Sequence, residues 1–292
     1  MDYTIENDFL RVTVTTAGAQ IKSIIRKVDG VEHMWNGNPD VWKYHSPVMF
    51  PYAGKVKDGK IVIRGKVVEN APQHGFHRIS THELVSHSQD CVVLALSANE
   101  QTMALFPYSF RFLSTFRLEG DSISHTLTVE NTDCEPFTFG TGYHPAFTIP
   151  FDSNHKAEDY ELRFSDMESP LCLEAPTGLL NGKYYALGTN IHTIPITDGM
   201  FNAGSHCMVN LRSTTLGIYE KDSGRAVVCD IEPFPYCLIW SQPGMPQFVC
   251  IEPWQSLPST ESGGYEWDQK AAAAMVAPGE SWSTTMKTSF IR

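Results

Sequence analysis

Basic residues are scarce in this sequence, and none of them form a run. The 292 residues include 22 Lys and Arg against 33 Asp and Glu, for a net charge of −11. Because binding to phosphates requires clustered Lys and Arg, this balance predicts no nucleic-acid partner and no anionic membrane surface. No segment approaches the roughly 20 apolar residues of a membrane-spanning helix. The first residues also lack the basic and apolar regions of a signal peptide, so we expect a cytoplasmic protein.

Patterns that would indicate a disulfide framework, a metal or a nucleotide are also absent. The seven cysteines form no C-x-x-C pair, and most lie in apolar, strand-like contexts, so we expect buried reduced thiols. His77, His82 and His87 lie close together, but their spacing matches no zinc ligand set. There is no Walker loop, Rossmann glycine pattern or G-x-S-x-G segment. We therefore predict no metal and no cofactor.

Helical periodicity is scarce as well. One segment, 267–275 with its four consecutive alanines, is typical of a helix, because Ala is the best helix former. Short runs with alternating apolar and polar residues dominate instead, and they predict β-strands. These runs cover 9–14, 19–25, 61–64, 91–96, 110–118, 122–129, 160–164, 208–211, 216–219, 226–231, 236–240, 248–251 and 281–289. Residues 119–121 include Gly120 and predict the turn of a hairpin between two of them.

Many short strands with turn signals between them predict an all-β fold, a large antiparallel sandwich or barrel with a few short helices. The composition, 42% hydrophobic and 19% charged, is ordinary for a globular protein with a sizeable core. We find no repeat and no linker, so we expect a single domain over 1–292. Long loops are expected at 27–60 and 166–200, and loops of that length are commonly functional or carry small helices. The oligomeric state stays open, with a homo-oligomer among the alternatives.

Three clusters combine an ionisable side chain with Gly or Pro and an aromatic residue. They span 73–78, 142–147 and 250–254. Gly and Pro mark the ends of strands, and binding groups commonly lie on the loops that follow a rigid sheet. Two imidazoles, a guanidinium and a carboxylate beside aromatic rings indicate acid–base chemistry on a polar small molecule such as a sugar.

Glu252 and His144 are the candidate proton-transfer residues. Glu252 follows the apolar run 248–251 and precedes Pro253, so we expect it where a buried strand stops, with a raised pKa suited to a general base. The alternative is a structural salt bridge or a turn cap. His144 follows a strand-like segment and two glycines, and histidine exchanges protons near pH 7. Its alternative role is a hydrogen bond to the backbone at a strand end.

His74 and Arg78 are candidate substrate-binding residues. A planar guanidinium beside an imidazole suits vicinal hydroxyl groups or a phosphate. Four tryptophans, Trp35, Trp42, Trp240 and Trp254, could stack on a sugar face, although aromatic residues more often belong to the core.

Taken in order along the chain, these segments resemble the aldose 1-epimerase (galactose mutarotase-like) superfamily, and most closely its LacX-like branch. The similarity extends over nearly the whole chain. The segments that carry it are Thr4-Ile5-Glu6-Asn7, Ala17-Gly18-Ala19, residues 34–42, Met49-Phe50-Pro51-Tyr52-Ala53-Gly54, His74-Gly75-Phe76-x-Arg78, Tyr143-His144-Pro145-Ala146-Phe147, Ile251-Glu252-Pro253-Trp254 and Ala277-Pro278-Gly279-Glu280.

The resemblance implies the large antiparallel β-supersandwich of that superfamily, with a sugar on its concave sheet. It also implies that Glu252 is the catalytic base and His144 the acid. His74 would bind the substrate and stabilise the ring oxygen, and Trp254 would also contact the sugar. Arg78 matches a position that some branches use for phosphorylated hexoses.

This chain departs from the family pattern at two places. Lys55 stands where many relatives carry an arginine that reaches the sugar, and lysine lacks the bidentate fork. The stretch 201–206 lacks the aspartate that often binds sugar hydroxyl groups, which leaves the sugar preference open.

Three functions follow from these observations. The first is an aldose 1-epimerase acting on a free or phosphorylated sugar, with no cofactor. The second is a non-catalytic carbohydrate-binding or sugar-sensing protein with the same fold. The third, a glycoside-processing enzyme, would need two carboxylates about 5–10 Å apart, and the sequence identifies Glu252 alone.

Overall fold

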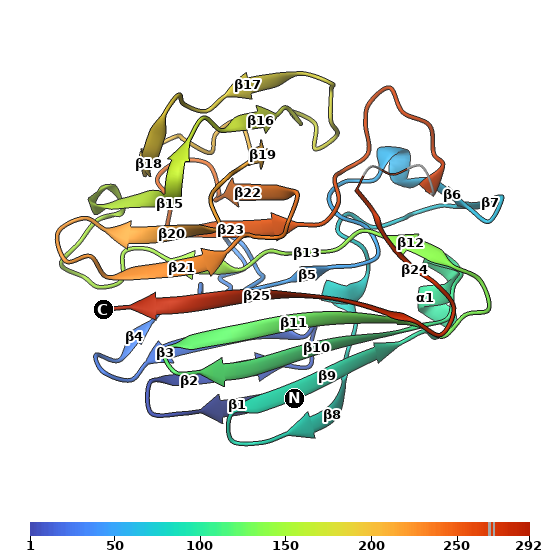
Figure 1. The fold of residues 1–292 in the computed structure, drawn as a ribbon, viewed down its shortest axis with the longest axis horizontal. Helices are drawn as coiled ribbons and strands as arrows, with labels where there is room; N and C mark the ends of the chain where they lie inside the picture. Colours follow the sequence, from blue (N-terminus) through green and yellow to red (C-terminus); the bar gives the residue numbers. More distant parts are fainter. Residues whose placement is uncertain (268–269, 271) are drawn as a thin grey trace.

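The computed structural model of the chain describes residues 1–267, 270 and 272–292. Within these residues, strands dominate, helices are few and short, and every pairing between the named strands is antiparallel (Figure 1). The predicted all-β antiparallel fold is therefore confirmed. No helix of the described part is long and apolar enough to cross a membrane.

The larger of two main sheets has nine strands among the described residues. Their order is β18 (Ile191–Pro195), β15 (Tyr160–Glu168), β20 (Thr215–Glu220), β21 (Ala226–Asp230), β25 (Ser281–Ile291), β11 (Ser122–Asn131), β10 (Phe110–Glu119), β9 (Cys91–Ser97) and β8 (Glu83–His87). The long strands β25, β11, β10 and β9 run side by side across the molecule in Figure 1.

The second main sheet has eight described strands. Seven follow the order β17 (Tyr184–Ala186), β16 (Leu171–Leu173), β19 (His206–Val209), β22 (Tyr236–Trp240), β23 (Phe248–Trp254), β13 (Gly142–Tyr143) and β5 (Val48–Met49), and β14 (Ala146–Thr148) also pairs with β23. Several of these strands lie in the regions 27–60 and 166–200, which we expected to be loops with small helices. Most of both regions is indeed loop, and 27–60 carries the 3₁₀ helix η1 (Lys57–Gly59), but the short strands that interrupt the loops were not predicted. Strands of two or three residues are too short to show a period.

Smaller elements complete the fold. The strands are β1 (Asp2–Glu6), β2 (Leu10–Thr15), β3 (Gln20–Arg26) and β4 (Val31–Glu32) in one sheet, the pair β6 (Ile61–Ile63) and β7 (Lys66–Val68), and the pair β12 (Phe137–Phe139) and β24 (Ala274–Val276). The helices are α1 (Glu100–Leu105) and the 3₁₀ turns η1 (Lys57–Gly59), η2 (His77–Ile79) and η3 (Ala157–Asp159).

The helix predicted at 267–275 is wrong where it can be tested. Residues 268, 269 and 271 lie outside the described residues, but 274 and 275 belong to strand β24, which pairs with β12. The strand pairing of this segment overrides the helix propensity of alanine. Helix α1 was not predicted, although Asn99 and Thr102 form a capping box at its start.

The β10–β11 hairpin follows its sequence pattern. Glu119 pairs with Ser122, so the turn predicted at 119–121 is confirmed, and Gly120 adopts the positive φ of 61° that the turn requires. Along β10 buried residues alternate with more exposed ones, and the buried set includes Phe110, Phe112 and Phe116. An antiparallel sheet with one face on the core produces this alternation.

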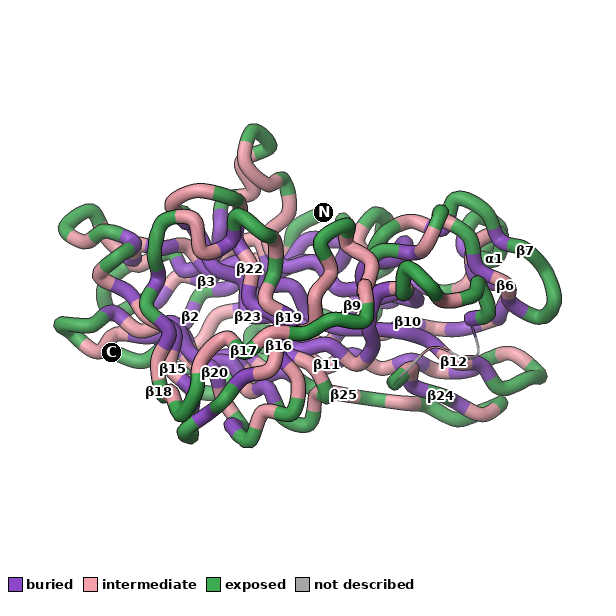
Figure 2. The backbone as a smooth tube through the Cα atoms, turned by 90° about the horizontal axis from the view of Figure 1, so that it is seen from above, coloured by how far each residue is buried: buried purple, intermediate pink, exposed green. Residues whose placement is uncertain are grey.

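Strand β23 is different because all seven of its residues are buried. The strand lies in the middle of its sheet, where the tube in Figure 2 is mostly purple. Val249 and Ile251 belong to the main core, whereas Phe248, Cys250 and Trp254 belong to clusters on the other side of the strand. Because side chains alternate between the two faces of a strand, Glu252 projects to the same face as Cys250 and Trp254.

Our expectation that the strand stops before Glu252 was wrong, since β23 continues to Trp254. Among the described residues, β13 pairs with β23 at Trp254, and β14 pairs with β23 at residues 248–250. Residues 251–253 have no partner in either of these two strands. Pro253 lies in that interrupted stretch, where its missing amide N–H breaks no ladder bond on this side. A proline therefore does not mark the end of this strand.

Several histidines are part of the core. His33, His77, His82 and His125 are all buried, and burial lowers the pKa of each, to about 3 for His33 and His125 and about 4 for His82. Both ring nitrogens of His33 lack a hydrogen-bond partner, and the ring packs against Phe151 and Phe290 at centroid distances of 5.0 Å. These side chains are therefore neutral in the folded protein.

We predict that His33→Phe makes folding less sensitive to acid. Below about pH 6.5 the unfolded chain protonates this histidine while the folded chain does not, until pH falls to about 3. In that window one such group removes about 1.4 kcal/mol of stability per pH unit. Urea unfolding of the wild type and the variant at pH 7, 6 and 5 measures the difference. An equal slope in His33→Phe and wild type would contradict the assignment.

Candidate active site

A cavity of about 440 Å³ opens on the face of the eight-stranded sheet to which Glu252 projects. Its floor includes Cys207 of β19, Leu238 and Trp240 of β22, and Glu252 and Trp254 of β23. The six residues singled out from the sequence, Lys55, His74, Arg78, His144, Glu252 and Trp254, all line this cavity. The structure thus brings together residues that are up to about two hundred positions apart in the chain.

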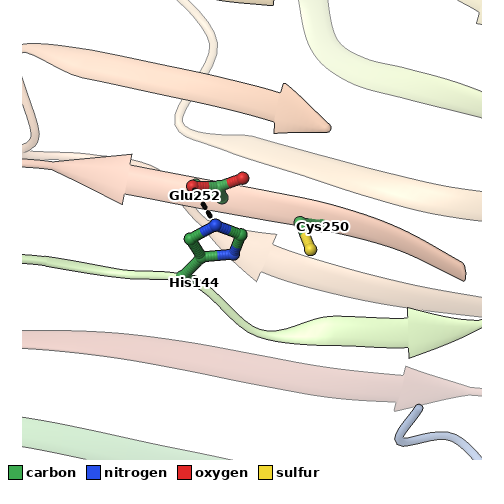
Figure 3. Close-up of side chains that lie close together, drawn as sticks. All are labelled: His144, Cys250 and Glu252. Carbon is green, nitrogen blue, oxygen red and sulfur yellow. Dashed lines mark ion pairs between the residues drawn. The ribbon is translucent and has the colours of Figure 1, made fainter. Parts of the chain in front are cut away.

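His144, in the short link between β13 and β14, faces Glu252 of β23 (Figure 3). The chain pairs with β23 on both sides of His144, and Ala146 stands opposite Cys250, which places His144 opposite Glu252. Side chains at opposite positions of neighbouring strands project to the same face. The Nε2 of His144 accordingly lies 3.4 Å from Oε2 of Glu252.

Burial raises the pKa of Glu252 well above its usual value, in the direction that the apolar sequence context predicted. The side chain is almost inaccessible to solvent. One hydrogen bond opposes this effect, because the indole Nε1 of Trp254 donates to Oε2 of Glu252 at 3.2 Å. Gly142 makes room for that indole, since a Cβ at this position would lie 2.9 Å from Cδ1 of Trp254.

Burial also lowers the pKa of His144, to about 3, and the nearby charge of Arg78 acts in the same direction. Trp42 stacks on the imidazole at a centroid distance of 5.0 Å, and Trp240 meets it edge-on at 5.6 Å. Both shifts favour the uncharged forms, so the pair formed by His144 and Glu252 holds one proton and no net charge. Such a pair can accept a proton at one member and donate one from the other.

His74 is held in an unusual backbone conformation. Its φ is +63°, and the next residue, Gly75, has φ +70° and a Cβ position only 2.0 Å from the carbonyl oxygen of Phe50. No other residue would fit at Gly75 without moving the backbone. The amide N–H of Gly54 donates to Nδ1 of His74 at 3.2 Å, and burial lowers the pKa of the ring. The neutral ring therefore carries its proton on Nε2, which lies 3.2 Å from the side-chain amide of Gln73 at the cavity wall.

Two cationic side chains line the same cavity. The Nη2 of Arg78 donates to the carbonyl oxygen of Gln73 at 3.0 Å, and its guanidinium lies over the ring of Tyr44 at 4.8 Å. The Nε of Arg78 is buried without a hydrogen-bond partner. Lys55 is more exposed, and its Nζ donates to the carbonyl oxygen of Thr177 at 2.8 Å. Arg78 is thus fixed near the pair, whereas Lys55 joins two loops of the wall.

Several lining residues were missed by sequence reasoning. Ser205 and its neighbours 203–204 line the cavity, and they belong to the stretch 201–206 in which the family's aspartate is missing. Residues 175, 176 and 178 form part of the wall, from a region expected only to be a long loop. Gln73, whose side-chain amide lies 3.2 Å from Nε2 of His74, belongs to the cluster at 73–78 but was not predicted as a site residue. No local pattern marks such residues, because loops reach the site through tertiary contacts.

Comparisons with known proteins agree with this architecture. The family model described as Aldose 1-epimerase matches residues 1–289. The plasmid-encoded protein LacX of Lactococcus lactis subsp. lactis is 27% identical over 286 residues, with 95% of each chain covered. A galactose mutarotase related enzyme from Lactobacillus acidophilus has a TM-score of 0.95 at 26% identity, covering 100% of this chain and 98% of its own. A galactose mutarotase-like protein from Lactobacillus casei has a TM-score of 0.91 at 26% identity, covering 99% of this chain and 100% of its own.

These findings confirm the superfamily and the LacX-like branch that the sequence motifs indicated. The family model covers the strands that carry His144 and Glu252 as well as the segment of His74. This chain belongs to the aldose 1-epimerase family.

Proposed function

We propose that this protein is an aldose 1-epimerase, a mutarotase that interconverts the α and β anomers of an aldose or a sugar phosphate by acid–base ring opening. The observation that carries the proposal is the 3.4 Å contact between His144 and Glu252 at the wall of a 440 Å³ cavity. That volume is in the range of small-molecule sites, and an acid and a base that share one proton are the groups that the reaction needs.

In the proposed reaction the proton of the pair moves from Glu252 to His144 across their 3.4 Å contact when the sugar binds. The carboxylate of Glu252 then accepts the proton of the O1 hydroxyl group as the C1–O5 bond breaks. His144 donates its proton to O5, and the open-chain aldehyde then rotates about C1–C2. The ring closes on the other face of the carbonyl with both transfers reversed, so neither residue changes overall. Each well-placed acid or base of this kind contributes about 10²–10⁴-fold to the rate.

Two neighbours would support these transfers. The indole N–H of Trp254 bonds to Glu252 and would stabilise the carboxylate form while the sugar hydroxyl group is bound. The ring of His74 lies 5.7 Å from that of His144, centroid to centroid, and its Nε2–H would donate to a sugar oxygen beside the reacting bond. His74 therefore binds and orients the sugar, and His144 and Glu252 perform the proton transfers.

The alternative, a non-catalytic carbohydrate-binding or sugar-sensing protein, has one observation in its favour. The ammonium group of Lys55, which replaces an arginine that reaches the sugar in many relatives, is bonded to Thr177 in the cavity wall. A glycoside-processing function has less support. Glu252 is the one carboxylate among the described residues that line the cavity, whereas that chemistry uses two.

The substitution Glu252→Gln tests catalysis against binding. It keeps the size and hydrogen bonding of the side chain but removes the basic oxygen, so we expect mutarotation to fall by about 100-fold or more with little change in sugar affinity. NMR exchange between anomers over a panel of hexoses, pentoses and hexose 6-phosphates measures the rate. Glu83→Gln on the edge strand β8 serves as the control and should keep full activity. Wild-type mutarotation by Glu252→Gln on the best sugar would favour the binding protein instead.

Arg78→Ala tests whether the substrate carries a phosphate. If it does, the variant loses a charge-assisted hydrogen bond of about 1.5–3 kcal/mol, so kcat/KM for the hexose 6-phosphate should fall by about 10- to 150-fold. We expect kcat/KM for the neutral hexose to change much less. Arg117→Ala, an exposed cation on β10 outside the cavity, provides the control for charge alone. Equal losses on both sugars would assign Arg78 to the sugar ring rather than to a phosphate.

A further inference from the structure

Three side chains that can bind a metal, His144, Cys250 and Glu252, lie close together (Figure 3), and two of them, His144 and Glu252, line the cavity. Cys250 and Glu252 occupy alternate positions of β23 and project to the same face of the sheet. His144 projects to that face from the adjacent segment between β13 and β14. One ligand atom from each of the three lies within 4.8 Å of the other two, and all three residues are buried. Cys250 is a free thiol.

The spacing is close to that of a tetrahedral site. Two ligands held about 2.0–2.1 Å from one zinc ion are about 3.3–3.4 Å apart, and a thiolate at about 2.3 Å is about 3.6 Å from each of them. The Nε2 of His144 and Oε2 of Glu252 are already 3.4 Å apart. The sulfur of Cys250 is no more than 4.8 Å from the ligand atoms of the other two residues, at most about 1.2 Å beyond the spacing of a bound thiolate.

The types of ligand select the class of cation. One nitrogen, one thiolate and one carboxylate match zinc and other thiophilic divalent ions, whereas Mg²⁺ and Ca²⁺ prefer oxygen ligands alone. Three protein ligands leave a fourth position, as in zinc sites that are open to a small molecule. Here that position faces the cavity, because His144 and Glu252 both line it.

A second cluster also has residue types that can bind a metal, but its carboxylates are already paired with an arginine. Asp152, His155 and Glu220 also place ligand atoms within 4.8 Å of one another. The guanidinium of Arg225 bonds to both carboxylates of that cluster, and His155 lies 2.7 Å from Asp152. A cationic side chain therefore already neutralises those acids. No cation of the described chain bonds to the carboxylate of Glu252 in this way.

We infer that His144, Cys250 and Glu252 form a binding site for Zn²⁺ or a similar thiophilic cation, and that occupation of this site blocks the sugar chemistry. The inhibitory part rests on the proposed function. The metal takes the lone pair of the imidazole and an oxygen of the carboxylate, and the thiol and the His144–Glu252 pair each release one proton to solvent. The base can then no longer accept the O1 proton and the acid can no longer donate to O5. The protein thus uses one constellation for catalysis and for inhibition by metal.

The first test measures inhibition. Mutarotation by the chelator-treated full-length protein is followed at increasing Zn²⁺, with each variant normalised to its own rate without metal. We expect Cys250→Ala to need at least about tenfold more Zn²⁺ for half inhibition than the wild type. Cys207→Ala is the matched control, since Cys207 is a buried cysteine of the same cavity that is not part of the three-ligand set, and it should keep wild-type sensitivity. Equal Zn²⁺ sensitivity of Cys250→Ala and the wild type would refute the site.

The second test does not depend on activity. Co²⁺ bound by a thiolate gives a sulfur-to-metal charge-transfer absorption band, which we expect in the wild type and in Cys207→Ala but not in Cys250→Ser. The serine variant keeps the size of the side chain, and its circular dichroism and unfolding midpoint verify that it is folded. Absence of the band in the wild type would overturn the metal site and leave the mutarotase proposal intact. A charge-transfer band in a wild-type protein that shows no mutarotation would support the metal site and overturn the mutarotase proposal.

Discussion

The arrangement of the site depends on one constraint, the burial of a carboxyl group in a strand that is covered on both faces. Glu252 lies in the middle of β23, where neighbouring residues alternate between the main core and the cavity. An ionised carboxylate loses much of its hydration there, so the proton on Glu252 is held more tightly than in water. The indole of Trp254 offsets part of that cost without supplying a charge. A cation in this place would stabilise the carboxylate and weaken it as a proton acceptor.

The same strand fixes the partner of Glu252. Register in an antiparallel sheet is strongly specified when one face is buried, because a slip of one residue would exchange the two faces. The pairing of Ala146 with Cys250 therefore sets His144 opposite Glu252. Trp42, in the loop between β4 and β5, stacks on the imidazole. The acid–base distance is thus a property of the sheet rather than of a flexible loop. Loops supply the walls, including Ser205 and the carbonyl oxygen of Thr177 that accepts from Lys55.

Period two in the sequence predicted the long strands of the fold, from β2 to β25, because those strands have one face on the core. It failed where tertiary contacts decide. β5, with two residues, is too short to show a period, and segment 274–276 pairs as a strand although alanine favours a helix. The sequence predicted that a strand ends at Pro253, and this was wrong. The proline is tolerated because the ladder beside it is interrupted, and that interruption depends on a segment more than a hundred residues away. The site motifs were identified through their order along the chain, which resembles a known family. The loop residues of the cavity have no such pattern.

The division between a fixed floor and variable walls has a consequence for how such a site can change. In the proposed reaction, proton transfer to and from the sugar requires groups held at one distance, and the pairing of β13 and β14 with β23 holds His144 opposite Glu252. Recognition of a particular sugar requires polar groups at other positions, and in this chain those positions belong to loops around Lys55, Gln73 and Ser205. Substitutions in the loops can alter which hydroxyl groups are bound without moving the acid–base pair. If the protein is the mutarotase proposed above, Lys55 and the missing aspartate near Ser205 are changes of this kind and bear on which sugar is bound.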